Sequence, residues 1–219
     1  MSSAILGGMA EDFPPIPLTR AEQQSRTRDA LVASARRVFA RDGFHGATLT
    51  AIAREAGLTK GAVYSNFDNK ADVFLAVLDD DLADVPESWE PVARFAFFPN
   101  LHGQSVRSPD LAAEDRDAVG FGLATVEFAT AAARDQELSD ALNERLGRFL
   151  AGYEAMARRG HRDDDPLSAE QLGAMLMALD QGASILWLIG QMGIDQMGID
   201  ADALREVMMR MLRPGEEEV

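Results

Sequence analysis

The segment formed by residues 48–70 constrains the fold of this chain more than any other part of its sequence. Apolar residues at positions 49, 52, 53 and 56 recur at helical spacing and predict a short helix after Thr48. Gly57 is expected to end that helix, because glycine adopts the left-handed conformation of helix C-termini without steric cost. Thr59 then occupies the N-cap position of a second short helix. Two short helices joined by a glycine-containing turn are typical of a helix-turn-helix, whose second helix enters the major groove of DNA.

The second of these helices has an apolar side, carried by Val63 and Phe67, and an outward side that is mostly polar. Hydroxyl, amide and ammonium groups can contact phosphates and base edges, and small residues let the backbone approach the groove closely. The predicted DNA-contacting residues are Thr48, Thr59, Lys60, Gly61, Ala62, Tyr64, Ser65, Asn66 and Lys70. For Tyr64 a second interpretation stays open, in which its ring closes the small core.

Charge is distributed unevenly along the chain. The total of −15 by itself argues against a polyanionic partner. Residues 20–70, however, hold nine basic and five acidic residues, so this segment carries +4 and the rest of the chain −19. A basic segment on an acidic body orients a protein on DNA, because one face is attracted and the other is repelled. Double-stranded DNA is therefore the predicted partner.

The motifs around the helix-turn-helix also carry a family resemblance. They are Ala35-x-x-Val38-Phe39, Gly43-Phe44-x-x-Ala47-Thr48, Ile52-Ala53-x-x-Ala56-Gly57-Leu58, Thr59-Lys60-Gly61-Ala62-Val63-Tyr64-x-x-Phe67 and Lys70-x-x-x-Phe74-Leu75. With these motifs, residues 27–78 resemble the DNA-binding domain of the TetR family of bacterial transcriptional repressors. The resemblance implies a repressor that leaves a near-palindromic operator when a small-molecule effector binds. It also implies a homodimer, formed through helices at residues 169–189 and 202–212.

No strand pattern occurs between residues 26 and 212, so the expected fold class is all-α. The predicted organisation is a flexible arm at residues 1–25, a helix-turn-helix domain of three helices at 26–72, a helical effector-binding and dimerisation domain at 73–213, and an acidic tail at 214–219. The arm is rich in glycine, serine and proline and either places arginines on DNA or is a plain tail. The helix at 169–189 is apolar nearly all round, which indicates burial on more than one side.

An effector pocket in the body is expected to be mostly apolar with a few polar groups. Its candidate residues are Phe95, Phe98, Phe121, Glu127, Phe128, Tyr153, Met177, Gln181 and Trp187, with Asp180 as a further polar candidate. Each of these also fits a place in the core or at a subunit interface. Aromatic and methionine side chains without basic partners favour an apolar, neutral or cationic effector.

Signals of catalysis are missing from the sequence. The chain has no cysteine, and His45, His102 and His161 lie far apart in predicted loops. It contains no motif of serine hydrolases, zinc proteases, P-loop proteins or dinucleotide-binding enzymes. We therefore expect no enzyme, no cofactor and no metal site.

The location of the protein is predicted from two further features. The first residues lack the basic start and apolar run of a signal peptide. The longest apolar stretch, residues 172–194, is interrupted by polar side chains. We expect a cytoplasmic protein without a membrane span. Two rival functions stay open: a regulator that activates or answers to no ligand, which transcript levels would separate, and a small-molecule carrier or enzyme with a vestigial helix-turn-helix.

Overall fold

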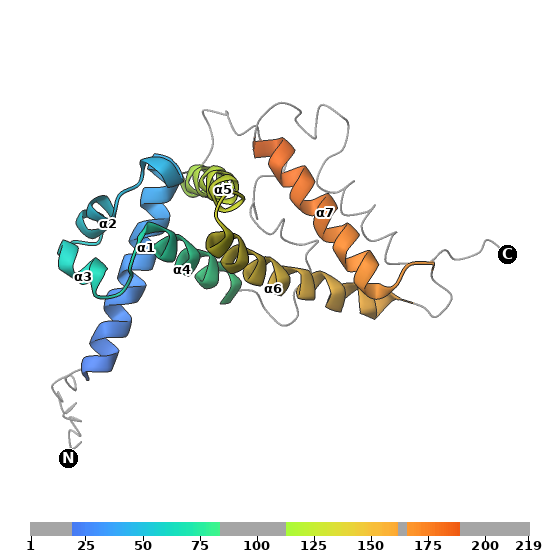
Figure 1. Ribbon diagram of the computed structural model, residues 1–219, viewed down its shortest axis with the longest axis horizontal. Coiled ribbons are helices and arrows are strands. Elements are labelled where there is room, and N and C mark those ends of the chain that lie inside the picture. The colour runs from blue at the N-terminus through green and yellow to red at the C-terminus, as the bar shows by residue number, and fades with distance from the viewer. Residues whose placement is uncertain (1–18, 84–112, 162–165, 189–219) are drawn as a thin grey trace, which may run out of the picture.

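The computed structural model describes residues 19–83, 113–161 and 166–188, and every element in these ranges is an α-helix, which confirms the predicted all-α class. The helices are α1 (Arg20–Gly46), α2 (Leu49–Glu55), α3 (Lys60–Tyr64), α4 (Lys70–Ala83), α5 (Ala113–Ala132), α6 (Gln136–Gly160) and α7 (Ala169–Leu188). Helices α1 to α4 form one end of the molecule, α5 lies beside the C-terminal part of α1, and α6 and α7 form the other end (Figure 1). The predictions for residues 1–18, 84–112, 162–165 and 189–219, including Phe95, Phe98 and the helix at 202–212, lie outside the described residues.

Helix α1 begins earlier than predicted. Its N-cap is Thr19, whose hydroxyl accepts the N–H of Glu22 at 3.2 Å while the Glu22 carboxylate accepts the N–H of Thr19 at 2.7 Å. This reciprocal capping box satisfies two backbone donors that a helix start leaves unpaired. The prediction of a flexible arm up to residue 25 was therefore wrong for residues 20–25. The Thr-x-x-Glu spacing is present in the sequence and could have indicated this start.

A cluster of phenylalanine rings joins α5 to the helices of the predicted DNA-binding domain. Phe74 of α4 is fully buried, and its ring centroid lies 4.9 Å from that of Phe39 and 4.6 Å from that of Phe128. Phe121 of α5 stacks on the same ring at 5.3 Å, and Phe44 packs against Phe128 at 5.0 Å. Edge-to-face and offset arrangements of this kind add to the burial of apolar area. The core of α1–α4 therefore continues into α5, without a break at the proposed boundary after residue 72.

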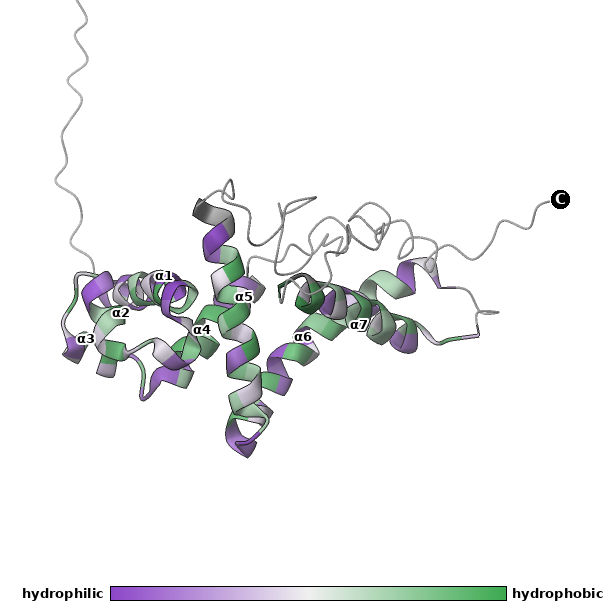
Figure 2. Cartoon of the chain, turned by 90° about the horizontal axis from the view of Figure 1, so that it is seen from above, coloured by the Kyte–Doolittle hydropathy of each residue, from purple (hydrophilic) through white to green (hydrophobic). Residues whose placement is uncertain are grey.

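Helices α6 and α7 pack against each other where the second half of α6 meets α7, and they diverge toward α5 (Figure 1). Asp135 caps α6 through the N–H of Leu138, and Ser168 with Gln171 forms the predicted capping box before α7. Contact between the two helices is close at Gly173, where a Cβ atom would stand 2.7 Å from the backbone nitrogen of Glu154. Both helices combine hydrophilic and hydrophobic residues (Figure 2), and those they bury include Tyr153, Met156, Leu172 and Leu176.

An ion-pair cluster links α4 to α6. The Asp79 carboxylate accepts hydrogen bonds from Arg145 at 2.6 Å and from Arg148. Burial by itself raises the pKa of Asp79, but the hydrogen bonds from Arg148 and Arg145 outweigh it and hold this pKa below its ordinary value. The cluster therefore fixes the ends of the molecule to each other while Asp79 is ionised.

Of the helices in the described ranges, none is both long enough and apolar enough to cross a lipid bilayer.

Candidate nucleic-acid interface

Two threonines fix the starts of the helix-turn-helix, as predicted. Thr48 caps α2 by accepting the N–H of Ala51 at 3.1 Å, and Thr59 caps α3 by accepting the N–H of Ala62 at 3.3 Å. Between them, Gly57 adopts a φ of 66°, the left-handed conformation expected at the turn. Both hydroxyls retain their own hydrogen for donation, and a phosphate oxygen is a suitable acceptor.

Helix α3 presents its first and last residues to the exterior. Val63 is fully buried, whereas Tyr64 is 51% exposed and Lys60 is also exposed. The Lys60 ammonium lies 5.5 Å from the centroid of the Tyr64 ring and forms no ion pair within the described residues. Because the Tyr64 ring is half exposed, it does not close the small core, and the structural interpretation left open above is wrong.

The side chains of the two residues after α3 form hydrogen bonds to the helix itself, which the sequence did not predict. The Ser65 hydroxyl donates to the carbonyl of Ala62 at 2.9 Å, and the Asn66 side-chain amide donates to the same oxygen at 2.8 Å. These contacts end the helix after a little more than one turn. Ser65 is exposed and Asn66 is half-buried, so Ser65 is the more accessible of the two.

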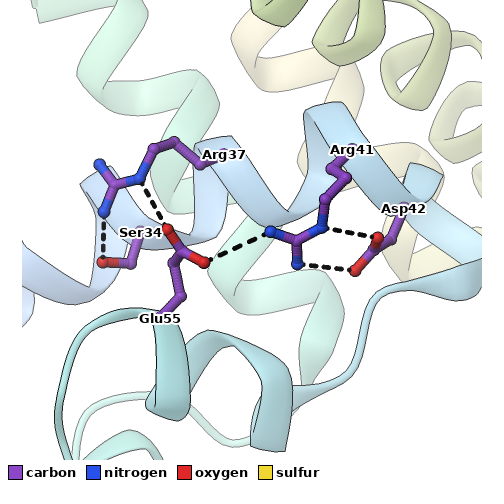
Figure 3. A network of polar contacts seen from close by, with 5 residues as sticks. All are labelled: Ser34, Arg37, Arg41, Asp42 and Glu55. Atoms are coloured by element: carbon purple, nitrogen blue, oxygen red, sulfur yellow. Dashed lines mark hydrogen bonds and ion pairs between the residues drawn. The ribbon is translucent and has the colours of Figure 1, made fainter.

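A polar network holds α2 against α1 and engages two of the arginines counted in the +4 segment (Figure 3). Glu55 of α2 accepts hydrogen bonds from Arg37 at 3.0 Å and from Arg41 at 3.3 Å. Arg41 also pairs with Asp42, and Arg37 donates to the Ser34 hydroxyl at 3.1 Å. Hydrogen bonds from these arginines hold the pKa of Glu55 below its ordinary value.

Three basic residues of the +4 segment thus form ion pairs within the protein, at its surface, since Arg36 pairs with Asp81 in addition to the pairs of Arg37 and Arg41. The +4 already includes Asp42 and Glu55, so only the pair with Asp81 involves an acid outside that segment. The basic residues of the segment without a carboxylate partner within the described residues are Arg20, Arg26, Arg28, Arg54, Lys60 and Lys70. Arg28 donates to the carbonyl of Asn66 at 3.3 Å and covers the Phe67 ring, which places the first half of α1 beside the end of α3.

Lys70 lies at the start of α4, and its ammonium forms hydrogen bonds within the protein. Its ammonium donates to the carbonyls of His45 at 3.1 Å and Ala47 at 3.0 Å. Burial lowers the pKa of Lys70, and the nearby charge of Glu127 opposes that shift. An ammonium has three hydrogens, so one remains beyond these two bonds for a phosphate.

The candidate pocket residues do not come together in one place. Phe121 and Phe128 belong to the phenylalanine cluster, and the Glu127 carboxylate accepts the N–H of His45 at 3.0 Å. Phe121 and Phe128 therefore take the core position that was the alternative to a pocket, and Glu127 lies beside a loop. The sequence did not show that α5 packs against α1. Met177 is half-buried on α7, and the side chain of Trp187 lies outside the description.

Tyr153 and Asp180 form a buried pair between α6 and α7, near Gln181. The Tyr153 hydroxyl donates to Oδ2 of Asp180, and the two residues are 0% and 2% exposed. Burial and then the charge of Asp180 raise the pKa of Tyr153 far above its ordinary value, so the phenol keeps its proton. One turn further along α7, the buried Ser184 hydroxyl has no hydrogen-bond partner in the described part of the chain. The pairing of α6 with α7 was not predicted, although Asp180 was a candidate.

Comparison with known proteins points to one class of regulator. Residues 31–77 match the sequence model of "Bacterial regulatory proteins, tetR family". The chain is 32% identical over 187 residues to the HTH-type transcriptional repressor BepR of Brucella suis biovar 1, covering 81% of this chain and 87% of that protein. It is 30% identical over 200 residues to the HTH-type transcriptional regulator TtgR of Pseudomonas putida, covering 88% and 94%.

The fold has counterparts among solved structures as well. A putative transcriptional regulator from Saccharomonospora viridis, crystallised in complex with choline, superposes with a TM-score of 0.57. The two sequences are 21% identical, and the match covers 86% of this chain and 96% of the other. This similarity concerns the arrangement of helices in both halves of the molecule.

Proposed function

This chain belongs to the TetR family of bacterial regulatory proteins, and from that premise we propose that it is a repressor that binds a near-palindromic operator as a homodimer and leaves it when a small effector binds. Its relatives BepR and TtgR are an HTH-type transcriptional repressor and an HTH-type transcriptional regulator. The observation that carries the proposal is the outward face of α3, where Lys60 and Tyr64 are exposed beside a capped and well-packed turn.

The DNA contacts follow from the chemistry of that face. Lys60 at the start of α3 reaches base edges or phosphates, and the Tyr64 hydroxyl donates to a phosphate while its ring packs along the groove wall. Gly61 and Ala62 permit close approach, and Ala62 suits the methyl group of thymine. Thr48, Thr59, Ser65, Asn66 and Lys70 complete the proposed contact set.

The homodimer is supported by the apolar residues that α7 exposes in the single chain. They are Met175, Leu179, Ile185 and Leu186, each between 39% and 45% exposed. An exposed apolar stripe of this size on one helix is typical of an interaction surface. We propose that residues 169–189 and 202–212 form the dimer interface, which places two copies of α3 about 34–36 Å apart, in successive major grooves.

The DNA upstream of the operon that encodes the chain provides a direct test in a gel-shift assay. We expect a sequence-preferring complex of nanomolar affinity, about what specific sites show at physiological salt. Because phosphate contacts release counterions, affinity should fall by about 10³-fold or more between 50 and 200 mM salt. Deleting the gene should raise transcript levels from the same operon. Failure to form a salt-sensitive, sequence-preferring complex would contradict the regulator proposal, and a fall in transcript would favour an activator.

For the effector, we propose a site between α6 and α7 beside the Tyr153–Asp180 pair, with Met177 and Gln181 at its edge. Gln181 lies 3.5 Å from the Asp180 carboxylate, which is buried among mostly apolar side chains and carries a negative charge when ionised. Such a site favours an apolar molecule with a cationic group. The choline complex of the S. viridis protein is consistent with this class.

Thermal unfolding in the presence of tetraphenylphosphonium, an apolar cation, tests the proposed effector class. At a hundredfold excess over Kd, a ligand of the folded state adds about 2.7 kcal/mol, which corresponds to a Tm increase of about 5–10 °C for a chain of this size. The increase should be lost in Asp180→Asn, which keeps the volume of the side chain but removes its charge. An equal increase in both proteins would show that Asp180 does not select the cation.

A further inference from the structure

The last residues of α1, from the break at Gly43 to Gly46, and the following Ala47 form a segment, here called the loop, that is held from two sides. From α5, the Glu127 carboxylate accepts the N–H of His45 at 3.0 Å. From α4, the Lys70 ammonium donates to the carbonyls of His45 and Ala47 at 3.1 and 3.0 Å. The same loop leads directly to Thr48, the N-cap of the first helix of the helix-turn-helix. The position of the loop therefore sets where α2 begins.

The loop is shaped around the Glu127 side chain. Gly43 has a φ of 71° and a ψ of 172°, a conformation that residues with a side chain rarely adopt. A Cβ atom on Gly43 would also stand 2.8 and 2.9 Å from the two carboxylate oxygens of Glu127. Next to it, the buried Phe44 ring lies between the Lys70 ammonium, 4.7 Å away, and the Phe128 ring of α5. Glu127 thus occupies space that only glycine leaves open.

A second close contact fixes α5 to α1. A Cβ atom on Gly120 would stand 2.1 Å from the carbonyl oxygen of Ala40, so the two helices approach as closely as glycine allows. Gly120 and Glu127 are two helical turns apart on α5 and hold α1 and its following loop at two points. At its other end, α5 is joined to α6 by a short turn, and Asp135 caps α6 (Figure 1).

Glu127 does not act here as a simple ion-pair partner of Lys70. The described ion pairs include none between these two residues, and the hydrogen bonds of each side chain go to backbone groups of the loop. The Glu127 carboxylate binds an N–H group of the loop, and the Lys70 ammonium binds two carbonyl groups of the same loop. Charged groups form stronger hydrogen bonds than neutral ones, so the pair restrains the loop more than neutral side chains would.

We propose that Glu127 is a positioning residue for DNA binding. Because its carboxylate holds the His45 N–H, α5 forms one rigid unit with the helix-turn-helix. A rearrangement of the effector-binding body then reaches α2 and α3 through α5, with Lys70 keeping the loop in place from the other side. This inference rests on the proposed DNA-binding function. It assigns Glu127 to the junction rather than to the effector pocket.

Hydrogen exchange measured by mass spectrometry on the full chain tests the proposal without DNA. In Glu127→Ala, peptides covering residues 43–65 should exchange about tenfold faster, because a charge-assisted bond to the loop is lost. Peptides from α6 and α7 should be unchanged. Glu127→Gln, whose amide oxygen still accepts the His45 N–H, should stay within about threefold of the original protein. Glu144→Ala removes an exposed glutamate of α6 and serves as the matched control.

DNA affinity provides the second measurement, with the upstream fragment that the original protein binds. Glu127→Ala should bind about tenfold more weakly, and Glu127→Gln and Glu144→Ala should bind nearly as well as the original protein. Unchanged exchange over residues 43–65, or equally faster exchange over α6 and α7, would overturn the positioning role. If the original protein binds no DNA, the proposed function fails, while the exchange data still decide the role of Glu127.

Discussion

Replacing Lys60 and Tyr64 together with alanine is expected to abolish specific DNA binding while the fold and the oligomeric state stay intact. Both side chains lie on the outside of α3, and neither supports the core. Each contact to a base or phosphate contributes about 1–3 kcal/mol and is made once by each copy of the proposed dimer, so the double variant should lose about 10³-fold in affinity or more. The single variants should each lose at least about tenfold. Fluorescence anisotropy with the upstream DNA measures these losses.

A charge-matched control separates local contacts from the net charge of the protein. Arg134→Ala removes one exposed cation between α5 and α6, far along the chain from α3. It should leave affinity within about twofold, because exposed charges beyond a Debye length of about 8 Å are screened at physiological salt. If the Lys60 and Tyr64 variants bind as well as this control, the assignment of α3 as the reading helix is wrong.

Truncating Phe74 to alanine is expected to be the most destabilising single change in the described core. Its ring is fully buried and packs against rings from α1 and α5 as well as Phe44. Phe→Ala changes in such places cost about 3–5 kcal/mol, through lost burial and the cavity that remains. Tm should fall by about 10 °C or more in a chain of this size. Because this cluster joins α5 to the helix-turn-helix, DNA affinity should fall with it.

An exposed apolar residue on α5 provides the comparison for that measurement. Leu123→Ala truncates a side chain that is 40% exposed in the single chain. It should cost less than about 1 kcal/mol, since surface changes away from special features are usually small. Equal losses of Tm for Phe74→Ala and Leu123→Ala would contradict the central place of the phenylalanine cluster.

Local features of this fold were predictable because their signals lie within a few residues of each other. Thr48 and Thr59 cap their helices and Gly57 takes the left-handed turn, all from spacing and intrinsic conformational preference. The capping box of Ser168 and Gln171 is another case. The resemblance to the TetR family rested on the same stretch, because the motifs of that family cover the helix-turn-helix and the residues on either side of it.

The errors arose where distant segments meet. Periodicity shows that a helix has an apolar side, but it does not say which helix covers that side. Phe121, Phe128 and Glu127 were therefore left open between a pocket and the core or an interface, and the structure places them against α1, α4 and the loop before α2. In the same way, counting charges could not show that Arg36, Arg37 and Arg41 are paired with carboxylates of α1, α2 and α4.

The proposed reading of DNA sequence by α3 in a symmetric dimer has one direct test. Selection of binding sequences from random double-stranded DNA by the purified chain tests this most directly, with the Lys60→Ala and Tyr64→Ala double variant carried in parallel. We expect enrichment of a near-palindrome with half-sites about one helical turn, or 10 base pairs, apart, bound with nanomolar affinity. Enrichment of no sequence beyond that recovered with the double variant would contradict the claim.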